Sequence, residues 1–142
     1  MTYEELEASG IIEKVSLSEE EIKDLIDIAN RDISTAEFVM THDIDWALTI
    51  AYNSVHQILL AIMYREGFRP KGEAKHKAVI DFCRIALGNK YKADIDIIDK
   101  MRKKRNRAVY QHIKVVSELE AREGIRFAKE FVAKVTKEKL RF

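Results

Sequence analysis

The sequence predicts an all-α fold, an antiparallel up-and-down bundle of four main helices plus a short extra element. Only one proline and five glycines occur in 142 residues, too few breakers for the many turns of a sheet-rich fold. Apolar residues recur at intervals of three and four along most of the chain, the spacing of a buried helix face. With 46% hydrophobic and 35% charged residues, the chain has the composition of one folded domain spanning residues 1–142.

Five helical segments follow from this periodicity and from the capping signals. Ser18 with Glu21, and Ser117 with Glu120, form capping-box patterns that predict the starts of the first and last of these helices. The second segment is the densest in apolar residues, so it is expected to be the most buried. The helices are expected at residues 18–41, 43–67, 73–87, 93–110 and 117–140.

The remaining segments are expected to be connections and a short N-terminal turn, which Thr2 with Glu5 caps and Ser9-Gly10 ends. Residues 1–17 are predicted to be a peripheral N-terminal segment whose apolar residues pack along the bundle. Residues 68–72 are expected to form a loop, because Pro70 cannot sit inside a helix. Trp46 and Phe82 lie on apolar helix faces and are expected in the core.

The sequence also predicts a cytoplasmic protein with no membrane association. The N-terminus is acidic and lacks the apolar run of a signal peptide. No segment approaches the roughly 18–20 uninterrupted apolar residues of a membrane span. The single cysteine, Cys83, is expected to be a small reduced core residue.

Charge is unevenly distributed although the net charge is only +1. Residues 1–50 hold thirteen acidic and three basic residues, whereas residues 51–142 hold eleven acidic and twenty-two basic residues. Such asymmetry suggests a basic surface for an anionic partner, or self-association between acidic and basic faces. A simpler alternative is that the acidic first helix packs beside basic helices within the domain.

Neither a metal site nor a cofactor is predicted. The four histidines, His42, His56, His76 and His112, lie on separate elements without the paired spacing of zinc ligands. A glycine-rich phosphate loop and a serine in a nucleophile-elbow context are both missing from the sequence.

The strongest candidate site is a basic helix that contains five cations within residues 102–107. They cannot all point into a core, because an unpaired buried charge is very costly, so they are expected to face solvent or a partner. Arg105 and His112, seven residues apart, project to nearly the same side, and Arg102 lies one turn earlier. A guanidinium grips phosphate oxygens and an imidazole titrates near neutral pH. This pair suits the metal-free attack of an RNA 2′-hydroxyl on its own phosphodiester, although a merely solvated cationic face is the simpler alternative.

The order of elements and several local strings resemble the HEPN domain family over residues 18–138. The string Arg105-Asn106-Arg107-Ala108-Val109-Tyr110 is the most specific part of the resemblance. The other strings are Ala51–Gln57 and Tyr64–Arg69 in and after the second helix, Lys75-His76 at the third, and Arg102–Tyr110 as a whole in the fourth.

The resemblance implies an all-α bundle that pairs into a homodimer, with the fourth-helix motif lining a shared cleft. Some members of the family are RNase toxins with an Arg, four to six residues and then a His. Others act as nucleotide- or RNA-binding modules, or as partners of small nucleotidyltransferases.

The resemblance also implies roles for individual residues. Arg105 would hold a phosphate and His112 would be the catalytic base or acid. Asn106 would orient the site or pack across the dimer, while Arg107 and Arg102 would widen the anionic footprint. Tyr110 would stack on a base or, as the favoured alternative, bury its ring with its hydroxyl on a neighbouring helix.

One departure from the toxin pattern affects the expected activity. In the most similar toxin form, a His is the fifth residue after the Arg of the motif and a Tyr is the seventh. Here Tyr110 is fifth and His112 is seventh. A tyrosine with a pKa near 10 is a poor base at neutral pH, so the exchange argues against nuclease activity.

Three functions are therefore predicted, in order of preference. The first is a dimeric RNA- or nucleotide-binding module, for which the resemblance implies a small nucleotidyltransferase as partner in a toxin–antitoxin-like system. The second is a metal-independent endoribonuclease using Arg105 and His112, and the third is a non-catalytic helical scaffold. Asn53 and His56 are expected to satisfy core or interface hydrogen bonds, and His76 is expected in a loop or a first helical turn.

Overall fold

The computed structural model describes residues 1–111 and 115–142, and its helices confirm the all-α fold class. A two-stranded antiparallel sheet is the only sheet within these residues. In chain order the elements are α1 (Tyr3–Ala8), β1 (Ile12–Lys14), α2 (Glu19–Val39), α3 (Ile44–Arg65), β2 (Phe68–Pro70), α4 (Lys75–Leu87), the 3₁₀ turn η1 (Asn89–Tyr91), α5 (Lys92–Tyr110) and α6 (Glu118–Lys139).

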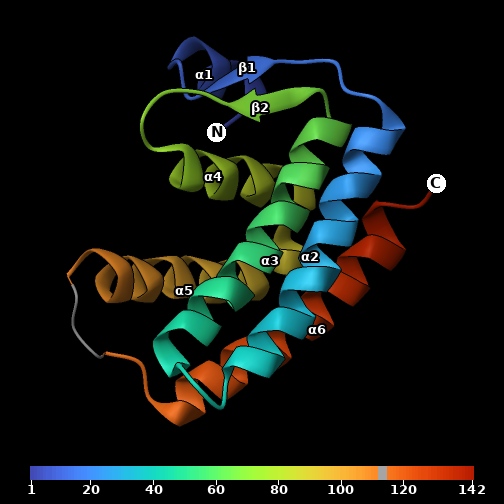
Figure 1. Cartoon of the computed structure of the whole chain (residues 1–142). Coiled ribbons are helices and arrows are strands. Elements are labelled where there is room, and N and C mark those ends of the chain that lie inside the picture. Colours follow the sequence, from blue (N-terminus) through green and yellow to red (C-terminus); the bar gives the residue numbers. More distant parts are fainter. Residues whose placement is uncertain (112–114) are drawn as a thin grey trace.

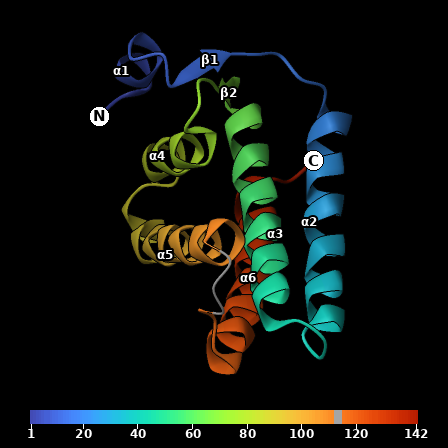
Figure 2. The ribbon, with the colours of Figure 1, turned by 60° about the vertical axis from the view of Figure 1, so that its left-hand side comes forward.

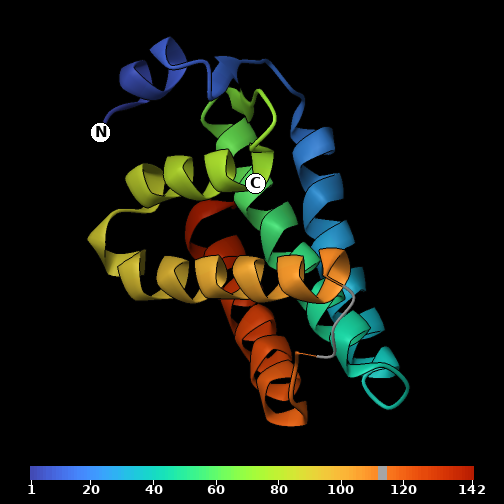
Figure 3. The ribbon, with the colours of Figure 1, turned by 90° about the vertical axis from the view of Figure 1, so that its left-hand side faces the viewer.

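The long helices form two groups, and α3 belongs to one of them and is crossed by the other. In Figure 1, α2, α3 and α6 are inclined in similar directions, while α4 and α5 lie across α3. Figure 3 shows α4 and α5 stacked one above the other. The short η1 turn between them reverses the chain, so they run antiparallel. The four main helices are therefore α2, α3, α5 and α6, but α5 crosses the others and does not continue a simple up-and-down bundle.

Helix α3 is the central element, as its apolar density predicts. Thirteen of its 22 residues are buried, because it contacts α2 and α6 on one side and α4 and α5 on the other. It is long and apolar enough to cross a membrane, but 67% of its most apolar window is buried inside the molecule. That burial is consistent with the core helix of a soluble protein.

Local capping signals place the helix starts accurately. Ser18 accepts a hydrogen bond from the Glu21 backbone N–H, and the Glu21 side chain accepts one from the Ser18 backbone. Ser117 and Glu120 form the same box at α6. Each box satisfies backbone donors that the first helical turn would otherwise leave unpaired.

The N-terminal segment and the segment after α3 form a small two-stranded sheet that the sequence did not predict. Strand β1 pairs with β2, with Ile12 opposite Pro70 and Lys14 opposite Phe68. Three-residue strands carry too little alternation to be recognised from sequence. In Figure 2 this sheet lies over the ends of α3 and α4, and the expectation of a plain loop at residues 68–72 was wrong.

Two core predictions differ in outcome. Phe82 is completely buried, as expected, whereas Trp46 is 52% exposed and the prediction for it was wrong. Trp46 lies in the first turn of α3, just after the capping residue Asp43. The next two residues, Ala47 and Leu48, are buried, so the Trp46 ring lies on the outward side of this turn.

Candidate functional site

The cations of α5 do not all face solvent, contrary to expectation. The Arg102 side chain is only 16% exposed and its guanidinium lies 3.0 Å from an Asp99 carboxylate oxygen. Lys104 is 26% exposed and reaches Glu120 of α6 at 3.1 Å. These ion pairs make half-buried cations tolerable, so part of the basic segment holds α5 in place.

Arg105 has a different environment from its neighbours. It lies seven residues after the fully buried Ile98 and therefore on the same inward side of α5. Its guanidinium carbon is 5.9 Å from the centre of the Tyr52 ring and 5.6 Å from that of Tyr110. These distances are within the range of a cation–π contact.

The guanidinium of Arg105 lacks a carboxylate partner within the described residues. Its Nη1 donates a hydrogen bond of 3.1 Å to the Asn106 side-chain oxygen. Its Nε is buried and has no hydrogen-bond partner in that part of the chain. A buried donor without an acceptor is costly, so Arg105 is suited to receive an anion.

Beside Arg105 lies a cluster that we name the tyrosine–histidine cluster, made of Tyr52 and His56 from α3 and His76 from α4. The Tyr52 hydroxyl is 2.8 Å from Nδ1 of His76. The two imidazole rings stack with their centres 4.1 Å apart. Tyr52 thus links the histidines to the Arg105 guanidinium.

Burial and positive charge keep both imidazoles neutral. Burial, reinforced by His76 and Arg105, lowers the pKa of His56 to about 3. Burial, then the charges of Arg105 and Arg102, lowers the pKa of His76. Desolvation is the main cause in each case because it penalises the charged form.

The same burial keeps the Tyr52 hydroxyl protonated. Desolvation raises the pKa of Tyr52 although Arg105 and Arg102 oppose the shift. A protonated hydroxyl can donate to or accept from Nδ1 of His76, so the tautomer of the imidazole sets the direction of their 2.8 Å hydrogen bond. The other ring nitrogen, Nε2, takes no part in this bond.

The remaining predicted site residues have mixed outcomes. Arg107 is exposed and Asn106 half-buried, so both can take part in a surface site on α5. Tyr110 is 68% exposed, so the favoured prediction of a buried ring was wrong; it occupies the last turn of α5, where neighbours are sparse. His112 lies outside the described residues, and its predicted role stays a prediction.

Asn53 and His76 behave as the sequence suggested, and His56 does so only in part. Asn53 donates a 2.7 Å hydrogen bond to the buried Asp32, and His76 lies in the first turn of α4. His56 is buried, but its Nδ1 has no partner among the described residues, so the expected satisfied hydrogen bonding was wrong for that atom.

Sequence reasoning missed the tyrosine–histidine cluster because its members are distant in the chain. Tyr52 and His56 are four residues apart and so share a face of α3, a pattern that local spacing can show. The sequence carries no spacing signal that connects this face with residue 76 or 105. Within residues 1–111 and 115–142 no group of three or more potential metal ligands occurs.

The fold and the site together define a class of protein. It is a mainly helical domain in which a partly buried arginine, without an ion-pair partner in the described part of the chain, lies beside two stacked imidazoles. The model of the HEPN domain matches residues 22–139, most of the chain, and this protein belongs to the HEPN family. The match confirms the resemblance noted from the sequence strings. No curated protein matches the chain. Family membership supports a nucleotide- or RNA-related module in general.

Proposed function

We propose that the protein is an RNA- or nucleotide-binding module in which Arg105 holds a phosphate group. The observation that supports this is the environment of Arg105, which is half-buried, has a buried Nε, and has no carboxylate partner within the described residues. A guanidinium binds phosphate oxygens through a planar fork of N–H donors. An unpaired charge inside a protein is stabilised when such an anion arrives.

The neighbouring residues of α5 complete the proposed site. Arg107 and Arg102 widen the positive field, although Asp99 partly neutralises Arg102. Asn106 holds the Arg105 side chain through its 3.1 Å hydrogen bond. The exposed ring of Tyr110, 5.6 Å from the Arg105 guanidinium carbon, can stack on a nucleobase.

The proposal includes a homodimer. A groove of about 450 Å³ runs between α3, α5 and α6, with Leu48, Ile97, Met101 and Phe127 among its apolar lining. Charges of both signs surround it, which suits the self-complementary contact of a two-fold axis. These charged residues are Lys100, Lys104, Arg126, Glu120, Glu123 and Glu130.

A small nucleotidyltransferase is proposed as the protein partner in a toxin–antitoxin-like pair, as the family resemblance implies. Co-expression with a nucleotidyltransferase encoded beside this chain, followed by affinity purification, tests that pairing. Recovery of this chain alone would contradict it.

A metal-independent endoribonuclease that uses Arg105 and His112 is the second candidate, because the Arg105 guanidinium has no carboxylate partner within the described residues and could hold the scissile phosphate. Incubation with unstructured RNA in EDTA tests it. Cleavage that is lost in both Arg105→Ala and His112→Ala would support the enzyme. Binding without cleavage would support the module.

Fluorescence anisotropy with a labelled oligouridylate tests the main proposal. Arg105→Ala should weaken binding at least about tenfold, the range for a lost charge-assisted hydrogen bond. Affinity should also fall steeply with salt, since phosphate contacts release counterions.

Arg122→Ala is the matched control, because Arg122 is an exposed arginine of α6 whose ion-pair partner, among the residues that the structure describes, is Glu118 four residues away. It removes the same charge far from the tyrosine–histidine cluster and should leave affinity within about twofold. Equal losses of affinity in Arg105→Ala and Arg122→Ala would show that the effect comes from net charge and not from the position of Arg105. Lack of RNA and nucleotide binding at low salt would leave the scaffold function.

A further inference from the structure

We propose that the pocket at the N-terminus of α4 is a second phosphate subsite, so that the ligand is a single-stranded oligonucleotide spanning from Arg105 to Lys75. This inference rests on the proposed function and specifies the ligand. A mononucleotide has phosphate at one position only, whereas a strand presents several phosphates to separate subsites.

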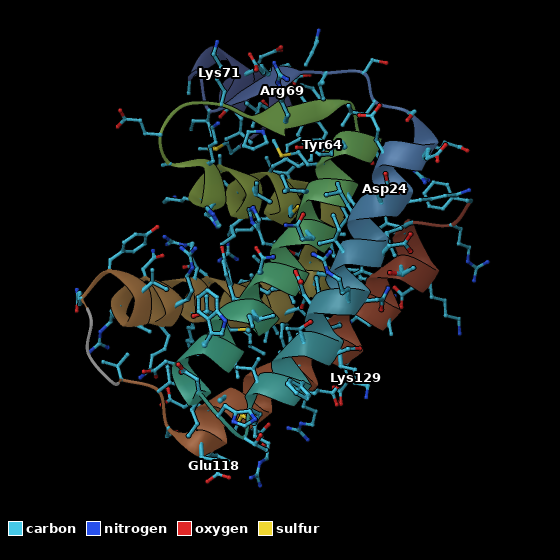
Figure 4. The ribbon with its side chains drawn as sticks, in the orientation of Figure 1. Asp24, Tyr64, Arg69, Lys71, Glu118 and Lys129 are labelled. Carbon is cyan, nitrogen blue, oxygen red and sulfur yellow. The ribbon has the colours of Figure 1, made fainter. Side chains whose placement is uncertain are left out.

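The pocket is open, with a volume of about 710 Å³, and it lies against the outer side of the histidine pair. His56 and His76 form part of its wall, together with Lys75, Lys71 and Arg69. Figure 4 shows Arg69 and Lys71 on the small sheet and the loop that follows it, above α4. The pocket thus joins elements that are adjacent in space to the tyrosine–histidine cluster.

The first turn of α4 supplies backbone donors to this pocket. Ala74 occupies the N-cap position and makes no side-chain capping bond, and the first turn has no acidic residue. The first N–H groups of a helix have no partner within the helix and carry the positive end of its dipole. Together with the Lys75 ammonium they favour an anion at this place.

The histidines give independent evidence for a ligand. His56 is 9% exposed and lines the pocket, yet its Nδ1 has no hydrogen-bond partner among the described residues. A buried polar atom that is left unsatisfied costs free energy and calls for a missing partner. His76 lines the same pocket, and because the Tyr52 hydroxyl occupies its Nδ1, the ring nitrogen left for a ligand is Nε2.

The carboxylates of the pocket do not cancel its positive charge. Glu13 binds Arg69 at 2.7 Å and lies 3.9 Å from Lys71, which holds both cations at the rim. Glu73 is the other acidic lining residue. Lys75 has no ion-pair partner within residues 1–111 and 115–142, so it is the cation most available to a phosphate.

The two phosphate positions lie on opposite sides of the tyrosine–histidine cluster. Arg105 contacts the Tyr52 ring from α5, whereas Lys75 adjoins His76 at the start of α4. A strand bound at both positions would pass over the imidazoles, whose neutral rings can stack on or hydrogen-bond to a base. One site would then bind at least two phosphates of the same strand.

Calorimetric titration with uridine 5′-monophosphate and with a uridine tetranucleotide tests the proposal. The wild type should bind the tetranucleotide at least tenfold more tightly than the mononucleotide. Lys75→Glu should remove most of this advantage while leaving mononucleotide affinity within about twofold. Arg105→Ala should weaken both ligands, which separates failure of this inference from failure of the proposed function.

Lys77→Glu is the matched control, because Lys77 lies in the same first turn but points to Asp81, at 2.9 Å, and does not line the pocket. It makes the same charge change and should preserve the tetranucleotide advantage. Equal loss in Lys77→Glu and Lys75→Glu would overturn the subsite, as would full retention of the advantage in Lys75→Glu.

A titration with inorganic phosphate, followed by NMR, tests the phosphate subsite even when oligonucleotides bind weakly. The side-chain resonances of His56 and His76 should shift in a saturable manner, while those of His42, on the α2–α3 connection, should not. Unchanged His56 and His76 resonances up to tens of millimolar phosphate would overturn the proposal.

Discussion

A buried imidazole with a depressed pKa couples folding to pH. The folded-state pKa of His56 is about 3, against an ordinary value of 6.5, because burial disfavours its cation. The unfolded chain therefore binds more protons than the folded chain between these two values. Stability contributed by this residue is complete above pH 6.5 and is lost as the pH falls toward 3.

His56→Gln tests this linkage. The wild type should lose roughly 3–5 kcal/mol of unfolding free energy through this residue as the pH falls across that window. The variant should show a shallower decline, measured by urea unfolding at pH 7, 5.5 and 4.5. Parallel curves for the two proteins would mean that His56 is readily protonated in the folded state.

The hydrogen bond between Tyr52 and His76 gives a second residue-scale prediction. Tyr52→Phe removes the hydroxyl that is hydrogen-bonded to Nδ1 of His76. The neutral His76 ring should then distribute its proton over both nitrogens, as ¹⁵N chemical shifts would report. The cost in stability should be about 1 kcal/mol, because water can reach the half-buried ring. Unchanged tautomer populations would show that other groups fix the ring.

Helices α3 and α6 approach closely at a glycine. A Cβ atom on Gly124 would stand 2.5 Å from Cδ1 of the buried Leu48. Gly124→Val should therefore overpack the contact and cost about 1–3 kcal/mol of unfolding free energy, measured by thermal or urea denaturation. Combining it with Leu48→Ala should cost less than the sum of the two single changes, and strict additivity would contradict the contact.

The sequence predicts individual elements well and their crossings poorly. Helix starts at Ser18 and Ser117 follow from capping boxes, which are local hydrogen-bonding patterns. The crosswise placement of α4 and α5 depends instead on the η1 turn and on which faces of α3 remain uncovered. The β1–β2 pairing joins segments more than fifty residues apart, and strands this short leave no periodic signal.

At the scale of the whole molecule, only part of the candidate site was predictable. Arg105 was identified because the basic segment is contiguous in sequence. Its inward direction was not predicted, since charge density alone suggested a solvated face. The cluster of Tyr52, His56 and His76 forms only when α3, α4 and α5 pack together, so its chemistry is a product of tertiary structure.

The proposed dimer is tested at this same scale. Phe127→Arg places a charge in the groove between α3, α5 and α6. Burying it without a partner is unfavourable, so the variant should be a monomer in multi-angle light scattering at micromolar concentration while retaining its circular dichroism. Phe38→Arg, on the exposed side of α2, is the control and should remain dimeric. A monomeric wild type would contradict the dimer itself.

The way Arg105 is held has a kinetic consequence. Its guanidinium is positioned by an amide oxygen and two aromatic rings, without a carboxylate within the described residues. If Arg105 holds a phosphate as proposed, the incoming phosphate has no salt bridge within the described residues to displace before it docks. Capture of the ligand should approach the electrostatically steered diffusion limit and slow sharply as ionic strength rises.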